Sequence, residues 1–109
     1  MGYRLKIYRA DYACCGGKLF GYISEEDLPK CKSWVWLNKH GYLYEEDKYC
    51  WDYCIEHTTM LYGDDYREFM DLYIKDYKKF GYNNPETIKE LTDSIDKTND
   101  SDVMIIRWV

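Results

Sequence analysis

The stretch DDYREFMDLYIKDYKKFG, residues 64–81, decides the fold, because it carries the clearest helical pattern in the chain. Apolar and aromatic side chains recur there at intervals of three and four, which places them on one face of a helix. These residues are Tyr66, Phe69, Met70, Tyr73, Ile74, Tyr77 and Phe80. The opposite face is charged. The sequence therefore predicts an amphipathic helix with Asp64 as its N-cap and Gly81 just beyond its last turn.

Two further helices are predicted, one before this stretch and one after it. The first begins near Pro29, which is tolerated in a first turn, and ends at Gly41. The last begins at Asn84-Pro85, because Asn is a favoured N-cap and Pro is favoured at the first helical position. It is expected to bury Ile88, Leu91 and Ile95.

Alternation of apolar and polar residues predicts the strands. Residues 3–9 alternate and are expected to form a half-buried strand, paired as a hairpin with residues 19–23. Residues 53–62 are ambiguous, and a strand is favoured there because of their β-branched side chains. Residues 103–109 are apolar on both faces apart from Arg107, which is typical of a strand inside a sheet.

These elements follow the order ββα-β-αα-β, and a chain of 109 residues fits one domain spanning residues 1–109. We therefore predict an α+β fold with a mainly antiparallel sheet of about four strands and three helices.

The net charge of −5 limits the classes of partner that the chain is expected to bind. Affinity for nucleic acid rests largely on Lys and Arg, and anionic membranes also attract basic proteins. We therefore expect neither direct nucleic-acid binding nor membrane binding, whereas a protein with a basic surface is a suitable partner. The beginning of the chain does not have the pattern of a signal peptide, so a cytoplasmic location is expected.

Five Cys and two His raise two alternatives, a zinc-stapled module and a small thiol enzyme. The nearest metal-like spacing is Cys50-x3-Cys54-x2-His57, which lacks two close Cys-x-x-Cys pairs. Cys14 or Cys15 on a Gly-rich turn has the ingredients of a nucleophile, but the sequence does not place a base beside it. Free Cys usually serves as a small buried residue, so we predict no cofactor, no metal site and no catalytic residue.

Acidic residues beside Tyr give the candidate partner-binding surface. The cluster at 45–47 lies in an irregular stretch between aromatic residues, a composition suited to binding Arg and Lys on another protein. Thirteen Tyr also exceed what one core needs, and exposed Tyr is enriched at interfaces. The predicted partner-binding residues are Tyr44, Glu45, Glu46, Asp47, Tyr49, Asp64 and Asp65.

Three short segments carry a resemblance: residues 2–5 (GYRL), residues 17–22 (GKLFGY) and residues 32–34 (KSW). With them the chain resembles small uncharacterised proteins of phages and prophages in low-GC Gram-positive bacteria. The resemblance implies a phage or mobile-element accessory protein that acts in the host cytoplasm, for example an anti-CRISPR-type inhibitor of a host nuclease that binds nucleic acid. It implies no catalytic residue.

Overall fold

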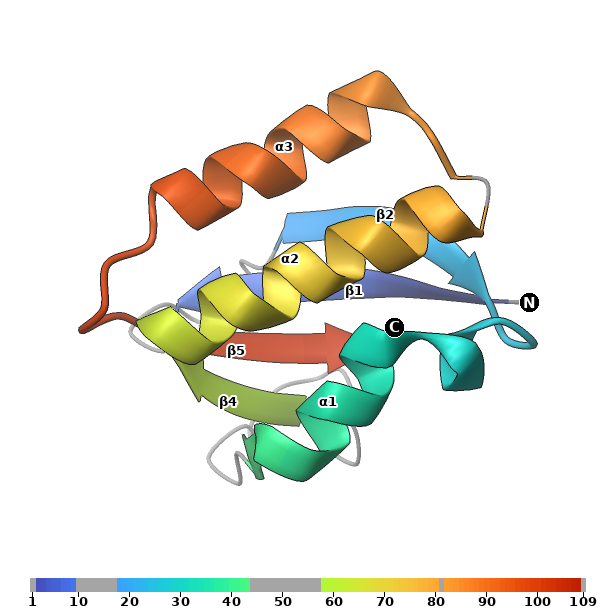
Figure 1. The fold of residues 1–109 in the computed structure, drawn as a ribbon. Coiled ribbons are helices and arrows are strands. Elements are labelled where there is room, and N and C mark those ends of the chain that lie inside the picture. The colour runs from blue at the N-terminus through green and yellow to red at the C-terminus, as the bar shows by residue number, and fades with distance from the viewer. Residues whose placement is uncertain (1, 10–17, 44–57, 81, 109) are drawn as a thin grey trace.

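The computed structural model describes residues 2–9, 18–43, 58–80 and 82–108. The strands are β1 (Gly2–Arg9), β2 (Lys18–Ser24), β3 (Tyr42–Leu43), β4 (Thr58–Tyr62) and β5 (Val103–Trp108). The helices are α1 (Lys32–His40), α2 (Gly63–Lys79) and α3 (Pro85–Asp96), and a short 3-10 helix, η2 (Leu28–Lys30), precedes α1. Figure 1 shows their arrangement.

One antiparallel sheet contains all five strands, in the order β2-β1-β5-β4-β3. The predicted α+β class, the hairpin of β1 and β2, and the interior position of β5 are confirmed. The two-residue strand β3, which the sequence did not predict, adds the fifth strand at one edge.

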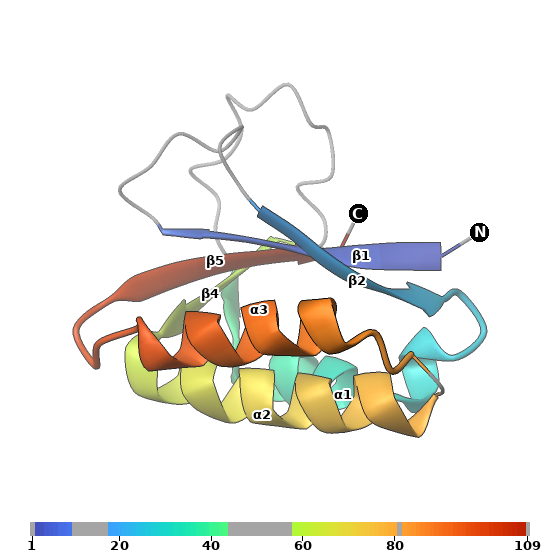
Figure 2. The same cartoon turned by 90° about the horizontal axis from the view of Figure 1, so that it is seen from above.

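All three helices cover the same face of the sheet, as the view in Figure 2 shows. The side chains between the layers form a core rich in aromatic rings. The Trp108 ring of β5 lies 6.1 Å from Phe69 and 5.9 Å from Tyr73 of α2, measured between ring centroids. Such contacts hold large rings in fixed positions and stabilise the packing beyond the area that they bury.

The predicted apolar face of the central helix is confirmed, because Tyr66, Phe69, Met70, Tyr73 and Tyr77 are buried in α2. The predicted N-cap is wrong: Tyr62 holds that position, and Asp64 lies in the first turn. Strand β4 runs directly into the helix, so the helix begins at Gly63, two residues earlier than an Asp64 cap would require. The cap of α3 is confirmed, since the Asn84 side chain accepts hydrogen bonds from the amides of Glu86 and Thr87.

The predicted start of the first helix near Pro29 is wrong: Pro29 lies in the 3-10 helix η2, Cys31 is extended, and α1 begins only at Lys32. The end of this helix and the strand at residues 58–62 agree with the structure. Helix α1 ends at a Gly41 C-cap, and residues 58–62 of the expected strand 53–62 form β4. Residues 53–57 and Gly81 lie outside the described residues. Within the described ranges, no helix has both the length and the apolar character that crossing a membrane requires.

Strand β1 is buried more completely than its alternation suggested. Lys6 and Tyr8 point away from the helices, yet they are only 7% and 6% exposed. Lys6 is paired in register with Arg107 of β5, which is fully buried. The prediction of a half-buried strand is therefore wrong, because the second face of the sheet is also shielded from solvent at these positions.

Strand β2 carries a bulge that depends on glycine. The register with β1 shifts between Tyr3 and Leu5, and Gly21 has a φ of 53°. A Cβ at Gly21 would lie 2.6 Å from the Tyr73 hydroxyl oxygen, so a larger residue meets both strain and a close contact. The bulge twists this edge of the sheet away from regular strand pairing.

A buried carboxylate joins α1 to α2. Asp76 is 3% exposed, and its two carboxylate oxygens accept hydrogen bonds from the backbone amides of Lys32 at 3.1 Å and Ser33 at 2.8 Å. These amides belong to the first turn of α1, where backbone donors have no partner within the helix. The side chain of one helix therefore caps another, and its negative charge also complements the dipole of α1.

We predict that Asp76→Ala lowers the free energy of unfolding by about 2–4 kcal/mol, because two amides lose charge-assisted hydrogen bonds in a buried place. Urea unfolding followed by circular dichroism measures this change. The matched control is Asp71→Ala on the exposed side of the same helix, where the ion pair to Lys75 is solvated and the expected change is within about 0.5 kcal/mol. Equal losses in the two variants would contradict the capping role.

Candidate functional site

The junction between β4 and α2 places an aromatic ring beside two carboxylates. Tyr62 ends the strand with 47% of its surface exposed, Asp64 is exposed, and Asp65 is half-buried. The backbone amide of Asp65 donates to Asp64 Oδ1 at 2.9 Å, which orients that carboxylate within the first turn of the helix. The structure thus brings together two of the predicted partner-binding residues with a ring that the prediction did not include.

The turn between α3 and β5 packs against this junction. A Cβ at Gly63 would lie 1.8 Å from the carbonyl oxygen of Asn99, so the first residue of α2 touches the turn directly. In Figure 1 the connection that follows α3 passes the start of α2 before it enters β5. We call this part of the surface the acidic end, and it comprises Tyr62, Asp64 and Asp65 at the start of α2 and Asp100 and Asp102 of the turn.

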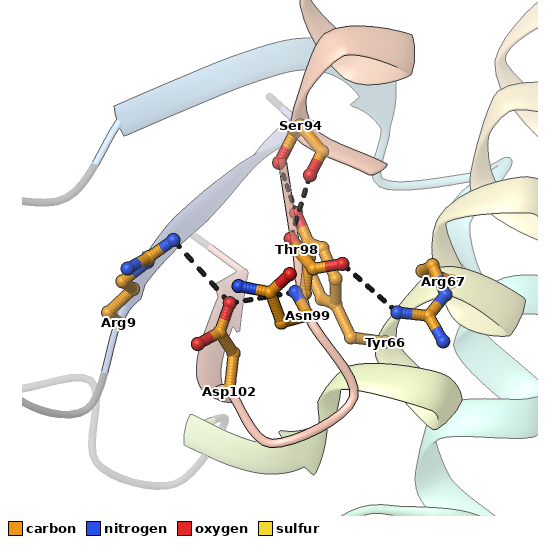
Figure 3. A network of polar contacts seen from close by, with 7 residues as sticks. All are labelled: Arg9, Tyr66, Arg67, Ser94, Thr98, Asn99 and Asp102. Atoms are coloured by element: carbon orange, nitrogen blue, oxygen red, sulfur yellow. Dashed lines mark hydrogen bonds and ion pairs between the residues drawn. The ribbon is translucent and has the colours of Figure 1, made fainter. Parts of the chain in front are cut away.

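A polar network holds the turn in place, as Figure 3 shows. Arg67 of α2 donates from Nη1 to the carbonyl oxygen of Thr98 at 3.0 Å, and its Nη2 pairs with the Asp100 carboxylate. Thr98 Oγ1 donates to the carbonyl oxygen of Ser94 at 2.7 Å. The acidic end is therefore tied to α2 and α3 through the turn.

The same network reaches the sheet through Asp102. Its Oδ2 accepts from the backbone amide of Asn99 at 2.9 Å and lies 3.4 Å from Arg9 Nη2 of β1. Figure 3 shows Arg9 approaching the turn from the strand, on the side opposite Arg67. The turn is thus fixed from a helix and from a strand, so its carboxylates have a defined geometry.

Tyr66 anchors the inner side of the network. Its hydroxyl makes a hydrogen bond with Ser94 Oγ, and burial raises the pKa of Tyr66 to about 12. The hydrogen bond to Ser94 acts in the opposite direction, but desolvation is the larger effect. The phenol therefore stays neutral at physiological pH and works as a structural hydrogen-bonding group.

A pocket of about 340 Å³ opens between α3 and the sheet, next to the acidic end. Ile7, Phe20 and Met104 give it apolar walls, and the polar lining includes Glu90 and Asp93 as well as Arg9 and Lys97. Apolar walls with a few convergent polar groups are typical of ligand pockets. The mixed signs of charge, however, do not select one class of small molecule.

The remaining predicted partner-binding residues, Tyr44, Glu45, Glu46, Asp47 and Tyr49, lie outside the described residues. Asp100, Asp102 and their cationic partners were not among the predicted residues, because no role was predicted for residues 98–102. The carboxylates in that turn were the available signal, but no sequence pattern indicated that the turn would meet the start of α2.

Cys31 does not have the environment of a reactive thiol. It is fully buried at the start of α1, its Sγ donates to the carbonyl oxygen of Asp27 at 3.5 Å, and burial raises its pKa to about 12. His40 lies at the other end of the same helix, roughly 13 Å from Cys31 along the helix axis. Its ring stacks on the ring of Trp36, with 4.6 Å between the ring centroids.

The zinc-stapled module and the thiol enzyme, the two alternatives raised by the sequence, depend largely on cysteine and histidine residues other than Cys31 and His40. Among the side chains that the structure describes, no three His, Cys, Asp or Glu groups gather as metal ligands. Cys14, Cys15, Cys50, Cys54 and His57 lie outside the described residues.

Four of the described tyrosines are buried, and Tyr3 and Tyr82 are partly buried against the core. Tyr8, Tyr66, Tyr73 and Tyr77 are buried, whereas Tyr22 and Tyr62 are 40% and 47% exposed. The abundance of Tyr thus reflects mainly the interior of the protein, and the exposed rings lie on the sheet. No protein-family model, curated protein or solved structure matches the chain, so its function is inferred from its own surface.

We predict that Gly63→Ala destabilises the protein by about 1–3 kcal/mol, because the added methyl group must displace the Asn99 backbone. Chemical unfolding measures the loss. Ser101→Ala changes an exposed residue of the same turn and is expected to shift stability by no more than about 0.5 kcal/mol. An unfolding free energy of Gly63→Ala equal to that of the wild type would show that the turn does not pack against α2 as described.

Alkylation should distinguish Cys31 from an exposed cysteine. A rise in pKa from 9.0 to about 12 lowers the thiolate fraction at neutral pH about a thousandfold, and the thiolate is the reacting form. Iodoacetamide treatment of the native protein, followed by peptide mass spectrometry, is therefore expected to leave Cys31 unmodified. Modification should appear when urea unfolds the chain. Rapid labelling of Cys31 in the native protein would contradict the burial.

Proposed function

We propose that this chain is a protein-binding accessory factor that uses its acidic end to occupy a basic surface on a larger partner. The observation that carries the proposal is the meeting of Tyr62, Asp64 and Asp65 with the carboxylates of the 98–102 turn. Segments far apart in the sequence build this surface together, and the network around the turn holds it rigid. A rigid surface loses less conformational entropy when it binds.

The ion pairs at the acidic end leave part of its negative charge uncompensated. Arg67 pairs with Asp100 and Arg9 with Asp102. Asp64 and Asp65, in contrast, form no ion pair with any cation that the structure describes. Together with the overall charge of −5, this arrangement favours encounter with a positively charged surface and disfavours nucleic acid.

Tyr62 supplies the apolar part of the proposed contact. Tyr is enriched among the residues that dominate binding energy, since it buries a large area and loses little side-chain entropy. Its exposed ring stands two residues before Asp64, so a partner Arg or Lys could contact the ring and a carboxylate at once.

The resemblance to phage and prophage proteins gives the proposal its finer form. We infer an inhibitor of the anti-CRISPR type that acts in the host cell on a defence nuclease. Carboxylates would take the place of phosphates in a nucleic-acid-binding cleft, and a Tyr ring would take the place of a stacked base. In this proposal the chain acts by occupying the cleft and performs no chemistry.

Affinity capture with matched charge reversals tests the proposal. The immobilised full chain is exposed to lysate of a low-GC Gram-positive bacterium, and the retained proteins are quantified by mass spectrometry. Asp64→Lys reverses a charge at the acidic end. Glu86→Lys makes the same change of charge in the first turn of α3. Both variants therefore place a positive charge at the N-terminus of a helix, and the unfavourable interaction with the helix dipole is the same in both.

The expected result is a basic protein that the wild type and Glu86→Lys retain equally and that Asp64→Lys retains about tenfold less. Raising the salt concentration should release this protein, because salt screens exposed charges. Identical retention by all three proteins would contradict the proposal. Retention that does not depend on salt would also contradict it.

A further inference from the structure

A second pocket lies at the end of the sheet opposite the acidic end, where β1 begins and β5 finishes. It has a volume of about 230 Å³, and we call it the aromatic pocket. Its lining consists of Tyr3, Glu25, Leu28, Pro29, Trp34 and Trp108. We propose that the aromatic pocket binds the side chain of a lysine on a protein partner.

Three rings from separate elements converge on this pocket. Tyr3 comes from β1, Trp34 from the first turn of α1 and Trp108 from the end of β5. Tyr3 and Trp34 are half-buried, whereas Trp108 is only 4% exposed. Aromatic rings carry negative potential over their faces, and pockets lined by several rings are a recurring means of binding an alkylammonium group.

The packing around the rings fixes the walls of the pocket before any ligand binds. Trp108 packs against both Phe69 and Tyr73 of α2. Trp34 follows directly after Ser33, whose backbone amide is hydrogen-bonded to Asp76. A preformed pocket avoids the entropic cost of ordering its walls when it binds.

The charge of the lining selects a cation. Glu25 is the one charged residue among the described residues that line this pocket, and it is exposed at the rim. A lone carboxylate beside rings favours a positive group and disfavours an anion. The apolar side chains of Leu28 and Pro29 complete the lining and suit the alkyl part of a long side chain.

A lysine side chain meets both requirements at once. Its alkyl stem can pack against Leu28 and Pro29 while its ammonium group faces the rings and the Glu25 carboxylate. The inference does not rest on the proposed role of the acidic end, because the two surfaces share no residue and lie at opposite ends of the sheet. Each can therefore fail without the other.

Nuclear magnetic resonance titration of the ¹⁵N-labelled full chain tests the proposal. The probes are Gly-Lys-Gly peptides with both ends blocked, the trimethyl-lysine analogue, and the norleucine analogue, which has a similar stem and no charge. The readout is the indole N–H resonances of Trp34 and Trp108. Saturable shifts are expected with both cationic peptides. The affinity for the norleucine peptide should be at least about fivefold lower than the affinity for the lysine peptide.

Two neighbouring acids provide the matched variants. Glu25→Gln removes the carboxylate from the pocket and is expected to weaken binding of the lysine peptide severalfold. Glu26→Gln changes the adjacent exposed acid, which does not line the pocket, and should leave the affinity unchanged. Trp34→Ala should abolish the shift at Trp108, with thermal melting recorded to show that this variant is folded.

Three results would overturn the proposal. The first is the absence of saturable shifts up to the solubility limit of the peptides. The second is equal affinity for lysine and norleucine, which would identify the pocket as a general apolar site. The third is an equal effect of Glu25→Gln and Glu26→Gln, which would reduce the attraction to net charge alone.

Discussion

The Asp76 carboxylate, buried between two helices, is the contact on which the helical layer depends. It accepts hydrogen bonds from two amides at the start of α1, a helix of nine residues that is too short to be stable alone in water. Through this contact α2 positions α1, a helix whose amphipathic pattern is weaker than its own. The free energy of desolvating the carboxylate is offset because both of its oxygens accept hydrogen bonds.

The layer that Asp76 completes supports two different surfaces at the two ends of the sheet. At one end, the start of α2 meets the 98–102 turn, so that Asp64 and Asp65 lie on the same end of the sheet as Asp100 and Asp102. At the other end, α1 brings Trp34 toward Tyr3 and Trp108. Rings packed in the core hold the elements that carry both surfaces, so the abundance of aromatic residues mainly stabilises the positions of these elements. The exposed groups then act from defined positions.

Elements with a strong period could be predicted from the sequence, and elements set by tertiary contacts could not. The apolar face of α2, the cap of α3 and the interior position of β5 follow from local pattern. The role of Asp76 does not, although a carboxylate three residues after Tyr73 on an apolar face was a signal. The two-residue strand β3 has too little sequence to show a period. The acidic end was predicted only at Asp64 and Asp65, because the proximity of the turn is a tertiary feature.

The arrangement of the helical layer depends most directly on whether Asp76 holds the first turn of α1 in solution. Amide hydrogen exchange, measured residue by residue under native conditions, tests this point because it reports the free energy of local opening. If Asp76 caps α1, the Lys32 and Ser33 amides exchange as slowly as core amides of α2, such as those of Phe69 and Tyr73. Rapid exchange at Lys32 and Ser33, alongside full protection of α2, would contradict this role of Asp76.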